Sequence, residues 1–260
     1  MSLGLAVAGI GTGLGTGIPG WPGAAARAEE AALHTAPHWD YTGPKGAENW
    51  RHLSPDYAAC GGTRQSPIDL GGALPVRDDA LELHWIPFAA DLTHNGHTLQ
   101  AAPRDKDAGY LTLDGKRFDF RQFHFHHPSE HAFAGKRWPL EVHAVHQAAD
   151  GNLAVIGILF RPGRENDVLA NIIGTMPRHG ETRPIPKPID LSQMLPRNAA
   201  AFAYAGSLTT PPCSEIVSWI VFRDPVEAGI GQIESFAREF PMNARPLQPS
   251  AGRPVNIDLF

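Results

Sequence analysis

The sequence predicts a mainly β protein built as a single domain with short peripheral helices. Glycine (27) and proline (24) are frequent and charged residues make up only 19% of the 260 residues, a composition that favours short strands joined by turns. Segments in which apolar and polar residues alternate recur along the chain, as in strands with one buried face. We find no repeat and no inter-domain linker, and an all-β domain of this length is commonly one unit.

Eight segments carry strand patterns. Strands are expected at residues 81–85, 91–93, 98–101, 110–113, 116–126, 141–147, 153–160 and 215–222. Between the fourth and the fifth of these, Asp114-Gly115 is a strong two-residue hairpin signal. The nearly continuous apolar run at 153–160 predicts a central strand that is buried on both faces, and 215–222 is a second such run.

Two helices are expected, at residues 165–176 and 230–240. In the second segment, isoleucines and phenylalanines recur near helical spacing. Residues 29–64 are expected to be irregular and anchored to the body of the domain by aromatic side chains, namely Trp39, Tyr41 and Trp50.

The first 28 residues resemble an export signal. The segment from Leu3 to Ile18 is apolar and rich in small residues, and Ala26-Arg27-Ala28 has the small-x-small form of a cleavage site. No lysine or arginine precedes Arg27, so a flexible leader or a misassigned start codon is an alternative. We expect a signal peptide at 1–28, a single domain at 29–260 and an exported protein that is periplasmic or secreted.

The chain has two cysteines, Cys60 and Cys213. In an exported protein an isolated pair usually forms one disulfide, although two unrelated buried thiols are the alternative. Neither cysteine belongs to a CxxC motif, so a zinc site made of cysteines is not expected.

Charge and hydropathy exclude two classes of partner. The net charge of -5 argues against a general nucleic-acid binder, which needs a basic face. After the leader, no run of eighteen strongly apolar residues predicts a membrane span.

The segment that indicates chemistry is His124-Phe125-His126, followed by His143 in a second alternating run. A strand sends residues 124 and 126 to one face and the phenylalanines to the other. If the two strands pair, three imidazoles converge with no obvious fourth protein ligand. A structural zinc is fully coordinated by protein, whereas a catalytic zinc keeps a position for water. The pattern therefore predicts a zinc hydrolase or hydratase.

Two polar residues strengthen this interpretation. Gln122 and Glu141 each lie two residues before a predicted ligand and share its face. Metal-bound imidazoles generally donate their second N–H to an amide, carboxylate or carbonyl, and these side chains are placed to accept it. The alternative is a set of histidines on a solvated strand face, which an HxH motif alone does not exclude.

Eight motifs follow one another from about residue 38 almost to the C-terminus: His38-Trp39-Asp40-Tyr41-Thr42-Gly43, Gln65-Ser66-Pro67-Ile68, Asn95-Gly96-His97, Gln122-Phe123-His124-Phe125-His126, Ser129-Glu130-His131, Leu140-Glu141-Val142-His143, Gly206-Ser207-Leu208-Thr209-Thr210-Pro211-Pro212-Cys213 and Arg245-Pro246-Leu247-Gln248. Together, and in this order, they resemble the α-class carbonic anhydrases of the exported bacterial type.

This resemblance implies a large, mostly antiparallel central sheet of about ten strands. It also implies one Zn²⁺ per chain, held by His124, His126 and His143, and the reversible hydration of carbon dioxide to bicarbonate and a proton by zinc-bound hydroxide. Cys60 and Cys213 fall where exported members of the family form a disulfide. Dimers occur among such relatives, and both a monomer and a homodimer remain open here.

The resemblance assigns further roles around the metal. Thr209 would orient the hydroxide while donating to Glu130, because a hydroxyl can donate and accept at once; on its own, Thr-Thr-Pro-Pro predicts only a rigid turn. Thr210 would line the substrate side. A nonpolar substrate needs a dry surface, and core packing is the alternative reading of the four side chains that would provide it: Val145, Val155, Leu208 and Trp219.

The resemblance also implies a route for the proton. A histidine titrates near physiological pH, and His97 matches the proton shuttle of the family. By itself, Asn95-Gly96-His97 predicts a type I′ turn with an exposed histidine. Tyr41, Asn95 and Gln100 would support a connecting water chain, although many family members carry asparagine where this chain has Gln100.

The remaining histidines are expected to be structural or on the surface. His127 should face away from the metal, and His131 and His146 are expected to form structural hydrogen bonds. No motif singles out the other five: His34, His52, His84, His94 and His179.

Three alternatives to catalysis of carbon dioxide hydration are considered. A cupin-like oxygenase could present HxH and a later histidine, but it would recruit a carboxylate and a redox-active metal. A non-catalytic binding module on the same fold would usually have lost a ligand histidine. A zinc store or carrier would have no use for an open coordination position or an apolar wall.

Overall fold

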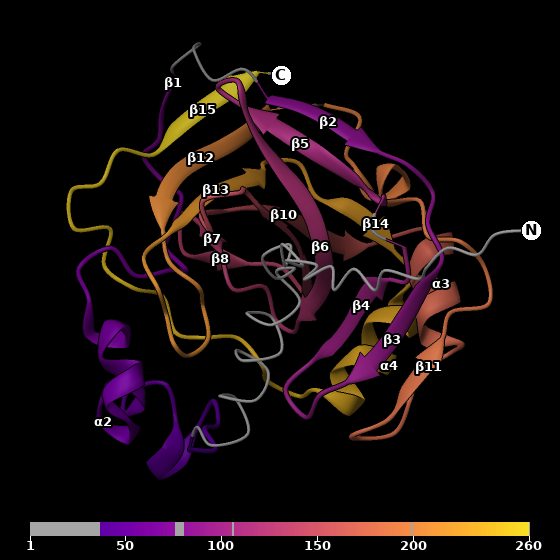
Figure 1. Ribbon diagram of the computed structural model, residues 1–260, viewed down its shortest axis with the longest axis horizontal. Helices are drawn as coiled ribbons and strands as arrows, with labels where there is room; N and C mark the ends of the chain where they lie inside the picture. The colour runs from indigo at the N-terminus through magenta and orange to yellow at the C-terminus, as the bar shows by residue number, and fades with distance from the viewer. Residues whose placement is uncertain (1–36, 76–80, 106, 199, 260) are drawn as a thin grey trace, which may run out of the picture. The chain divides into compact units, whose positions relative to one another are not determined.

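A large mixed β-sheet forms the centre of the protein (Figure 1). The structure is a computed structural model that describes residues 37–75, 81–105, 107–198 and 200–259. Apart from Pro37, these residues belong to one unit, His38–Phe260. The expected signal peptide at 1–28, its cleavage site and His34 lie outside the described residues.

The strands follow the chain in sequence order. They are β1 (Leu74–Pro75), β2 (Leu81–Trp85), β3 (Ala90–His94), β4 (Leu99–Pro103), β5 (Gly109–Leu113), β6 (Lys116–His126), β7 (Ala132–Phe133), β8 (Lys136–Arg137), β9 (Leu140–Gln147), β10 (Leu153–Pro162), β11 (Thr182–Pro184), β12 (Ala200–Gly206), β13 (Val217–Phe222), β14 (Val226–Ala228) and β15 (Asn256–Leu259).

Thirteen strands form the main sheet, and ten of them follow one another in the order β1-β15-β12-β13-β10-β9-β6-β4-β3-β11. The pairs β1–β15, β10–β13 and β10–β14 are parallel, and the other described pairs in this sheet are antiparallel. The strands β7 and β8 form a separate two-stranded sheet. The predicted mainly β fold with a large, mostly antiparallel sheet is therefore confirmed.

All eight predicted strands are present, with ends shifted by up to two residues. As predicted, β10 is central, because it lies between β9 and β13 and most of its residues are buried. The sequence analysis missed β12, whose four alanines have low intrinsic strand propensity. The other missed strands have only two to four residues, too few for a period-two pattern to be recognised: β1, β7, β8, β11, β14 and β15.

The two turns predicted from Asx-Gly pairs differ in outcome. Asp114 (φ 51°) and Gly115 (φ 75°) both have positive φ and join β5 to β6 with Leu113 opposite Lys116, as a type I′ hairpin requires. At Asn95-Gly96 only the glycine has positive φ (91°), so the predicted type I′ turn is wrong. The Asn95 side chain decides this turn, because its Oδ1 accepts from the backbone N–H groups of His97 and Thr98.

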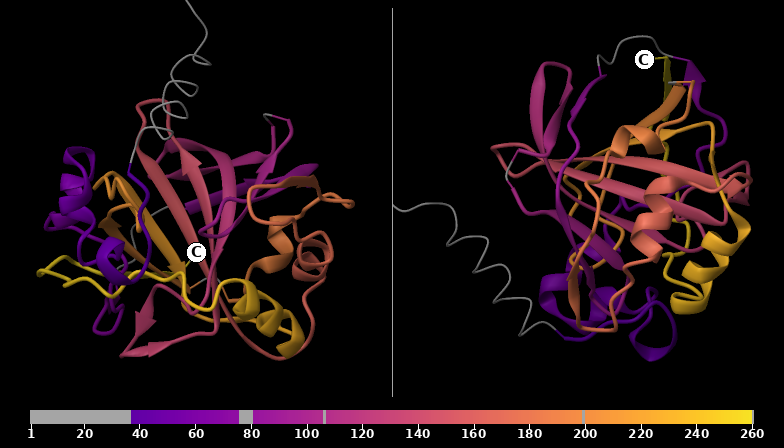
Figure 2. Two further views of the ribbon diagram at one scale, coloured as in Figure 1. Left: turned by 90° about the horizontal axis from the view of Figure 1, so that it is seen from below. Right: turned by 90° about the vertical axis from the view of Figure 1, so that its right-hand side faces the viewer.

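The helices are short, with at most ten residues each. They are η1 (Gly43–Lys45), α2 (Trp50–Leu53), η2 (Pro55–Gly61), α3 (Asp167–Ile173), η3 (Leu191–Met194) and α4 (Ile230–Glu239). The two expected helices correspond to α3 and α4, which lie together beside β3, β4 and β11, away from α2 (Figures 1 and 2). The segment expected to be irregular contains η1, α2 and η2, and Trp50 is fully buried there.

The main sheet has an apolar cluster on each of its two faces. On one face, alternate residues of the central strands, such as Phe125, Val142 and Ile158, pack in a cluster that includes Phe236 of α4. On the other face a smaller cluster includes Val155, Trp219 and other buried side chains. This second face also carries the predicted metal ligands. Among the described residues, no helix is long and apolar enough to cross a membrane.

Cys60 and Cys213 form the expected disulfide, which joins η2 to the segment before β13 across 153 residues of sequence. A crosslink over so long a loop removes much of the conformational freedom of the unfolded chain. The bond therefore fits an oxidising compartment and helps to hold the N-terminal helices on the sheet.

We expect the double variant Cys60→Ala/Cys213→Ala to lose about 4–5 kcal/mol of unfolding free energy, because the unfolded chain regains the freedom that the loop removes. Denaturant unfolding with and without dithiothreitol measures the loss. The reductant should destabilise the wild type and leave the double variant unchanged. A wild-type midpoint that does not respond to complete reduction would contradict this expectation.

Candidate metal centre

Three histidine side chains converge on one face of the sheet. His124 on β6 lies directly opposite His143 on β9, and His126 is two residues further along β6 on the same face. One ring nitrogen from each of the three lies within 4.8 Å of the others. His126 and His143 are each only 1% exposed. This group could hold a metal ion.

The hydrogen bonds of the β6 histidines define which nitrogen remains available. His124 Nδ1 lies 2.9 Å from Gln122 Oε1, and His126 Nδ1 lies 2.8 Å from the backbone oxygen of Asn243. Both oxygens can only accept, so each Nδ1 carries the proton. Each Nε2 then has a free lone pair, and Nε2 of His126 is buried without a hydrogen-bond partner among the described residues.

His143 has the opposite arrangement. Its Nε2 lies 2.8 Å from Glu141 Oε1, and because a carboxylate accepts, Nε2 carries the proton and Nδ1 is the free nitrogen. Three unprotonated ring nitrogens therefore face a common point. This is the donor set that fits a zinc ion, which takes neutral imidazole nitrogens as ligands.

Burial favours the neutral imidazoles that metal binding requires. The pKa of His124 is held well below its ordinary value by burial and by the neighbouring His126 and His143. Burial also lowers the pKa of His126, although Glu130 opposes this shift. At neutral pH neither ring has to release a proton before a metal binds.

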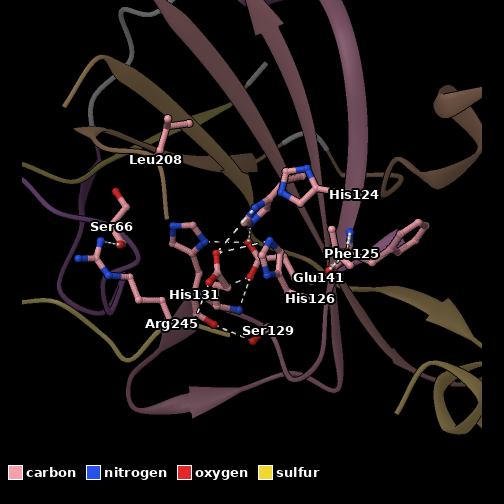
Figure 3. Close-up of polar contacts among 12 residues, drawn as sticks. Ser66, His124, Phe125, His126, Ser129, His131, Glu141, Leu208 and Arg245 are labelled. Carbon is pink, nitrogen blue, oxygen red and sulfur yellow. Dashed lines mark hydrogen bonds and ion pairs between the residues drawn. The ribbon is translucent and has the colours of Figure 1, made fainter. Parts of the chain in front are cut away.

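Glu141 is the centre of a buried hydrogen-bond network (Figure 3). Its Oε1 accepts from His143 Nε2 at 2.8 Å and from His131 Nδ1 at 2.7 Å, and its Oε2 accepts from the backbone N–H groups of Glu130 and His131. Burial would raise the pKa of Glu141, but the interactions with His131 and His143 outweigh burial and hold it well below the usual value. The side chain is therefore a buried carboxylate with four donors.

The network continues away from the metal centre through His131. Its Nε2 lies 2.7 Å from the Tyr204 hydroxyl, which donates to Ser66 Oγ at 2.9 Å. His131 is thus structural, as predicted, although it also belongs to a second group that could hold a metal, with Glu141 and His143. Because both of its ring nitrogens are engaged, we assign it to the network. His146 is also structural, since its Nδ1 bonds Ala144 O and its Nε2 accepts from Trp85.

Glu130 is fully buried beside the histidines. Its Oε1 accepts from the backbone N–H of Arg245 at 2.8 Å, and its Oε2 lies 3.6 Å from His126 Nε2 without a hydrogen-bond partner among the described residues. The hydrogen bond expected from Thr209 to Glu130 is therefore not formed in this structure. Thr209 is 5% exposed.

A cavity of about 170 Å³ opens above the three histidines. Thr210 and the four side chains expected to form an apolar wall all line it. These four also belong to, or pack against, the apolar cluster on this face of the sheet, so lining the cavity and packing in the core do not exclude each other. The cavity is also lined by Trp39 and Thr98, which were not predicted to belong to the site, and by six predicted site residues: Tyr41, Asn95, His97, Gln100, Gln122 and Thr209.

His97 also lines the cavity. Its ring stacks on Trp39 with centroids 3.8 Å apart and an interplanar angle of 8°, so it is half-buried and not exposed as the sequence predicted. Burial lowers the pKa of His97, and the adjacent His38 lowers it further, while Asp40 acts in the opposite direction.

Comparison with known proteins agrees with this geometry. Residues 45–258 match the family model of the eukaryotic-type carbonic anhydrases. The chain belongs to this family. A carbonic anhydrase of Klebsiella pneumoniae is 40% identical over 223 residues, covering 85% of this chain and 91% of the relative, and one of Nostoc sp. is 43% identical over 227 residues, covering 84% and 85%.

Solved structures lead to the same family. The α-carbonic anhydrase of Thermovibrio ammonificans, in a complex with the inhibitor sulfanilamide, superposes with a TM-score of 0.81 at 42% identity, covering 84% of this chain and 98% of that one. Carbonic anhydrases are lyases, and the predicted enzyme class is thereby confirmed.

Two residues of this carbonic anhydrase site were missed by the sequence analysis. Asn243 provides the backbone oxygen for His126, and its side chain donates to the backbone oxygens of His97 and Phe125. Arg245 donates its backbone N–H to Glu130, while its buried guanidinium donates to the backbone oxygen of Cys60 in η2. The motif that begins at Arg245 was noticed without a role, and no local pattern marks Asn243.

Glu141→Gln should lower the unfolding free energy of the metal-free protein by about 3 kcal/mol, because an amide NH₂ must then face buried donors. The folded-state pKa of Glu141 is depressed, so its contribution is present above the ordinary carboxyl range and is lost as the pH falls through the folded-state pKa. Urea unfolding of both proteins across the acidic range measures this. The exposed Glu234→Gln is the matched control, and a constant difference down to strongly acidic pH would contradict the assignment.

Proposed function

We propose that this chain catalyses the reversible hydration of carbon dioxide to bicarbonate and a proton, with one zinc ion held by His124, His126 and His143. The observation that carries the proposal is the set of three free, unprotonated ring nitrogens at the bottom of an apolar-walled cavity. When bound, zinc supplies Lewis-acid activation of water at neutral pH, the chemistry for which carbonic anhydrase is the standard example.

The hydrogen bonds behind the ligands serve to orient them. Gln122, Asn243 and Glu141 each take one ring N–H, which holds the opposite nitrogen towards the metal position. The Glu141 carboxylate also increases the electron density of the His143 ring, because its negative charge favours the partly charged imidazole. The three ligand rings are thus oriented by the protein before the metal binds.

The apolar wall suits a substrate without a dipole. Val155 and Trp219 are each 2% exposed, and with Val145 and Leu208 they form a surface that offers carbon dioxide no competing hydrogen bonds. Thr210, which is half-buried beside the wall, offers a hydroxyl to the charged product. The cavity therefore presents a dry side to the substrate and a polar side to bicarbonate.

Thr209 and Glu130 provide the orientation of the attacking oxygen. The unpaired Oε2 of Glu130 can accept a hydrogen bond from the Thr209 hydroxyl. The Thr209 oxygen can then accept a hydrogen bond from the attacking oxygen through one of its lone pairs. A hydroxyl that is fixed in this way selects one direction of attack.

His97 would carry the released proton from the cavity to solvent. It lines the cavity, it lies beside polar groups that can order water, and burial holds its pKa below the ordinary histidine value, so it is neutral and able to accept a proton at neutral pH. Tyr41, Asn95 and Gln100 line the same cavity and could hold the connecting waters.

We further propose that the protein acts outside the cytoplasm, in the periplasm or as a secreted protein. The disulfide between Cys60 and Cys213 supports this, because such bonds persist in oxidising compartments.

Stopped-flow hydration of carbon dioxide tests the proposal directly. The purified protein is measured as isolated, after removal of metal by a chelator and after addition of Zn²⁺. Activity should disappear and return with zinc. A folded, zinc-loaded protein without activity would instead favour a non-catalytic zinc-binding or carrier protein on the same fold.

His143→Ala should lose nearly all activity and most of its zinc, because one of three ligands is removed and Glu141 is left without one of its donors. Zinc content after gel filtration and stopped-flow rates are the two measurements. His84→Ala is the control, because it replaces an exposed histidine on β2 that lies far from His143 in the sequence. Retained zinc and full activity in His143→Ala would show that the ligand assignment is wrong.

His97→Ala should reduce kcat in dilute buffer on the order of tenfold or more, because proton export then depends on buffer molecules. Small imidazole buffers should restore the rate. The rate is measured by stopped flow at increasing buffer concentration. If the variant is as fast as the wild type in dilute buffer that does not transfer protons, His97 is not on the proton route.

A further inference from the structure

His94 lies at the end of β3, three residues before His97, and it is only 4% exposed. Its Nδ1 accepts a hydrogen bond of 3.2 Å from the backbone N–H of Gly96. Its Nε2 lies 2.8 Å from Oε1 of Glu239, the last residue of α4. A buried imidazole thus connects the turn that carries His97 to a helix 145 residues away in the sequence.

These two contacts fix the protonation of the His94 ring. A backbone N–H can only donate, so Nδ1 must have its lone pair free to bond Gly96. The proton then resides on Nε2, where the Glu239 carboxylate accepts it. Without Glu239 the two neutral tautomers compete, and the tautomer with a proton on Nδ1 cannot bond Gly96.

The same turn is held at further points. Asn95 Oδ1 accepts from the backbone N–H of His97, and Asn243 Nδ2 donates to the backbone oxygen of His97. The ring of His179 covers Gly96 so closely that a Cβ there would lie 2.7 Å from His179 Nε2. Both backbone groups of His97 are therefore fixed, and His94 with Glu239 fixes the glycine just before it.

We propose that His94 and Glu239 are positioning residues for proton transfer through His97. They hold the Gly96 amide and thereby set where the His97 ring meets Trp39 and the cavity. The inference rests on the proposed function, in which His97 exports the proton. Neither residue touches the reacting atoms, so both should affect the step that regenerates the enzyme more than the step that converts carbon dioxide.

The experiment compares three variants of the full-length zinc-loaded protein. Glu239→Ala removes the acceptor, Glu239→Gln keeps an oxygen that can accept from His94 Nε2, and Glu234→Ala on the exposed side of the same helix is the control. Glu239 is exposed, so its replacement should leave the core intact.

In dilute buffer, Glu239→Ala should lower kcat by roughly three- to tenfold, because a small displacement of a proton donor or acceptor slows transfer. The ratio kcat/KM for carbon dioxide should stay within about twofold of the wild type, since it reports the earlier step. Glu239→Gln and Glu234→Ala should retain the wild-type kcat, and imidazole buffer should restore Glu239→Ala.

A double variant separates positioning from general damage. If Glu239 acts through His97, Glu239→Ala should add nothing to the loss in His97→Ala, whereas independent effects would multiply. The ¹⁵N chemical shifts of the His94 ring give a second readout, which should show a proton on Nε2 in the wild type and a mixture of tautomers in Glu239→Ala.

Three results would overturn the inference. The first is a wild-type kcat for Glu239→Ala in dilute buffer while His97→Ala is slow. The others are a fall in kcat/KM of Glu239→Ala as large as its fall in kcat, and a double variant that is slower than His97→Ala alone. Failure of the proposed function is distinguishable. In that case the zinc-loaded wild type is inactive, or His97→Ala is as fast as the wild type, and the positioning role is rejected together with the shuttle.

Discussion

The pairing of β6 with β9 is the constraint on which the site depends. In this register His124 lies opposite His143. Two residues along the strands, on the same face, Val145 lies opposite Val155, which in turn lies opposite Trp219. Because side chains alternate along a strand, a slip by one residue would send the histidines into the opposite apolar cluster. One set of backbone hydrogen bonds thus places both the metal ligands and the apolar wall on the same face.

That placement requires polar atoms to be buried, and the structure compensates them almost completely. Glu141 accepts four hydrogen bonds, and His131 uses both ring nitrogens. A buried carboxylate without these donors would be strongly unfavourable. Two atoms next to the metal position, Nε2 of His126 and Oε2 of Glu130, remain without partners among the described residues. These two atoms lie where the proposed chemistry takes place; the third buried atom without a partner among the described residues is Nε of Arg245.

Segments distant in sequence complete the arrangement. Asn243 bonds His126 through its backbone and His97 through its side chain, so one residue fixes a ligand and the turn of the proposed shuttle. Arg245 bonds Glu130 through its backbone N–H and the backbone oxygen of Cys60 in η2 through its guanidinium. The ligands and the proton route are therefore supported by a common C-terminal segment, which packs against the sheet after α4.

The sequence by itself determined the period-two faces of the long strands, the Asp114-Gly115 hairpin and the three histidines, because each of these follows from neighbouring residues. It did not determine the short strands, the turn at Asn95 or the nitrogen that each histidine presents. The sequence alone could not show that His126 hydrogen-bonds a backbone oxygen 117 residues away, or that His94 hydrogen-bonds Glu239. Those choices belong to the tertiary structure, because a buried ring takes the proton position that its distant partners allow.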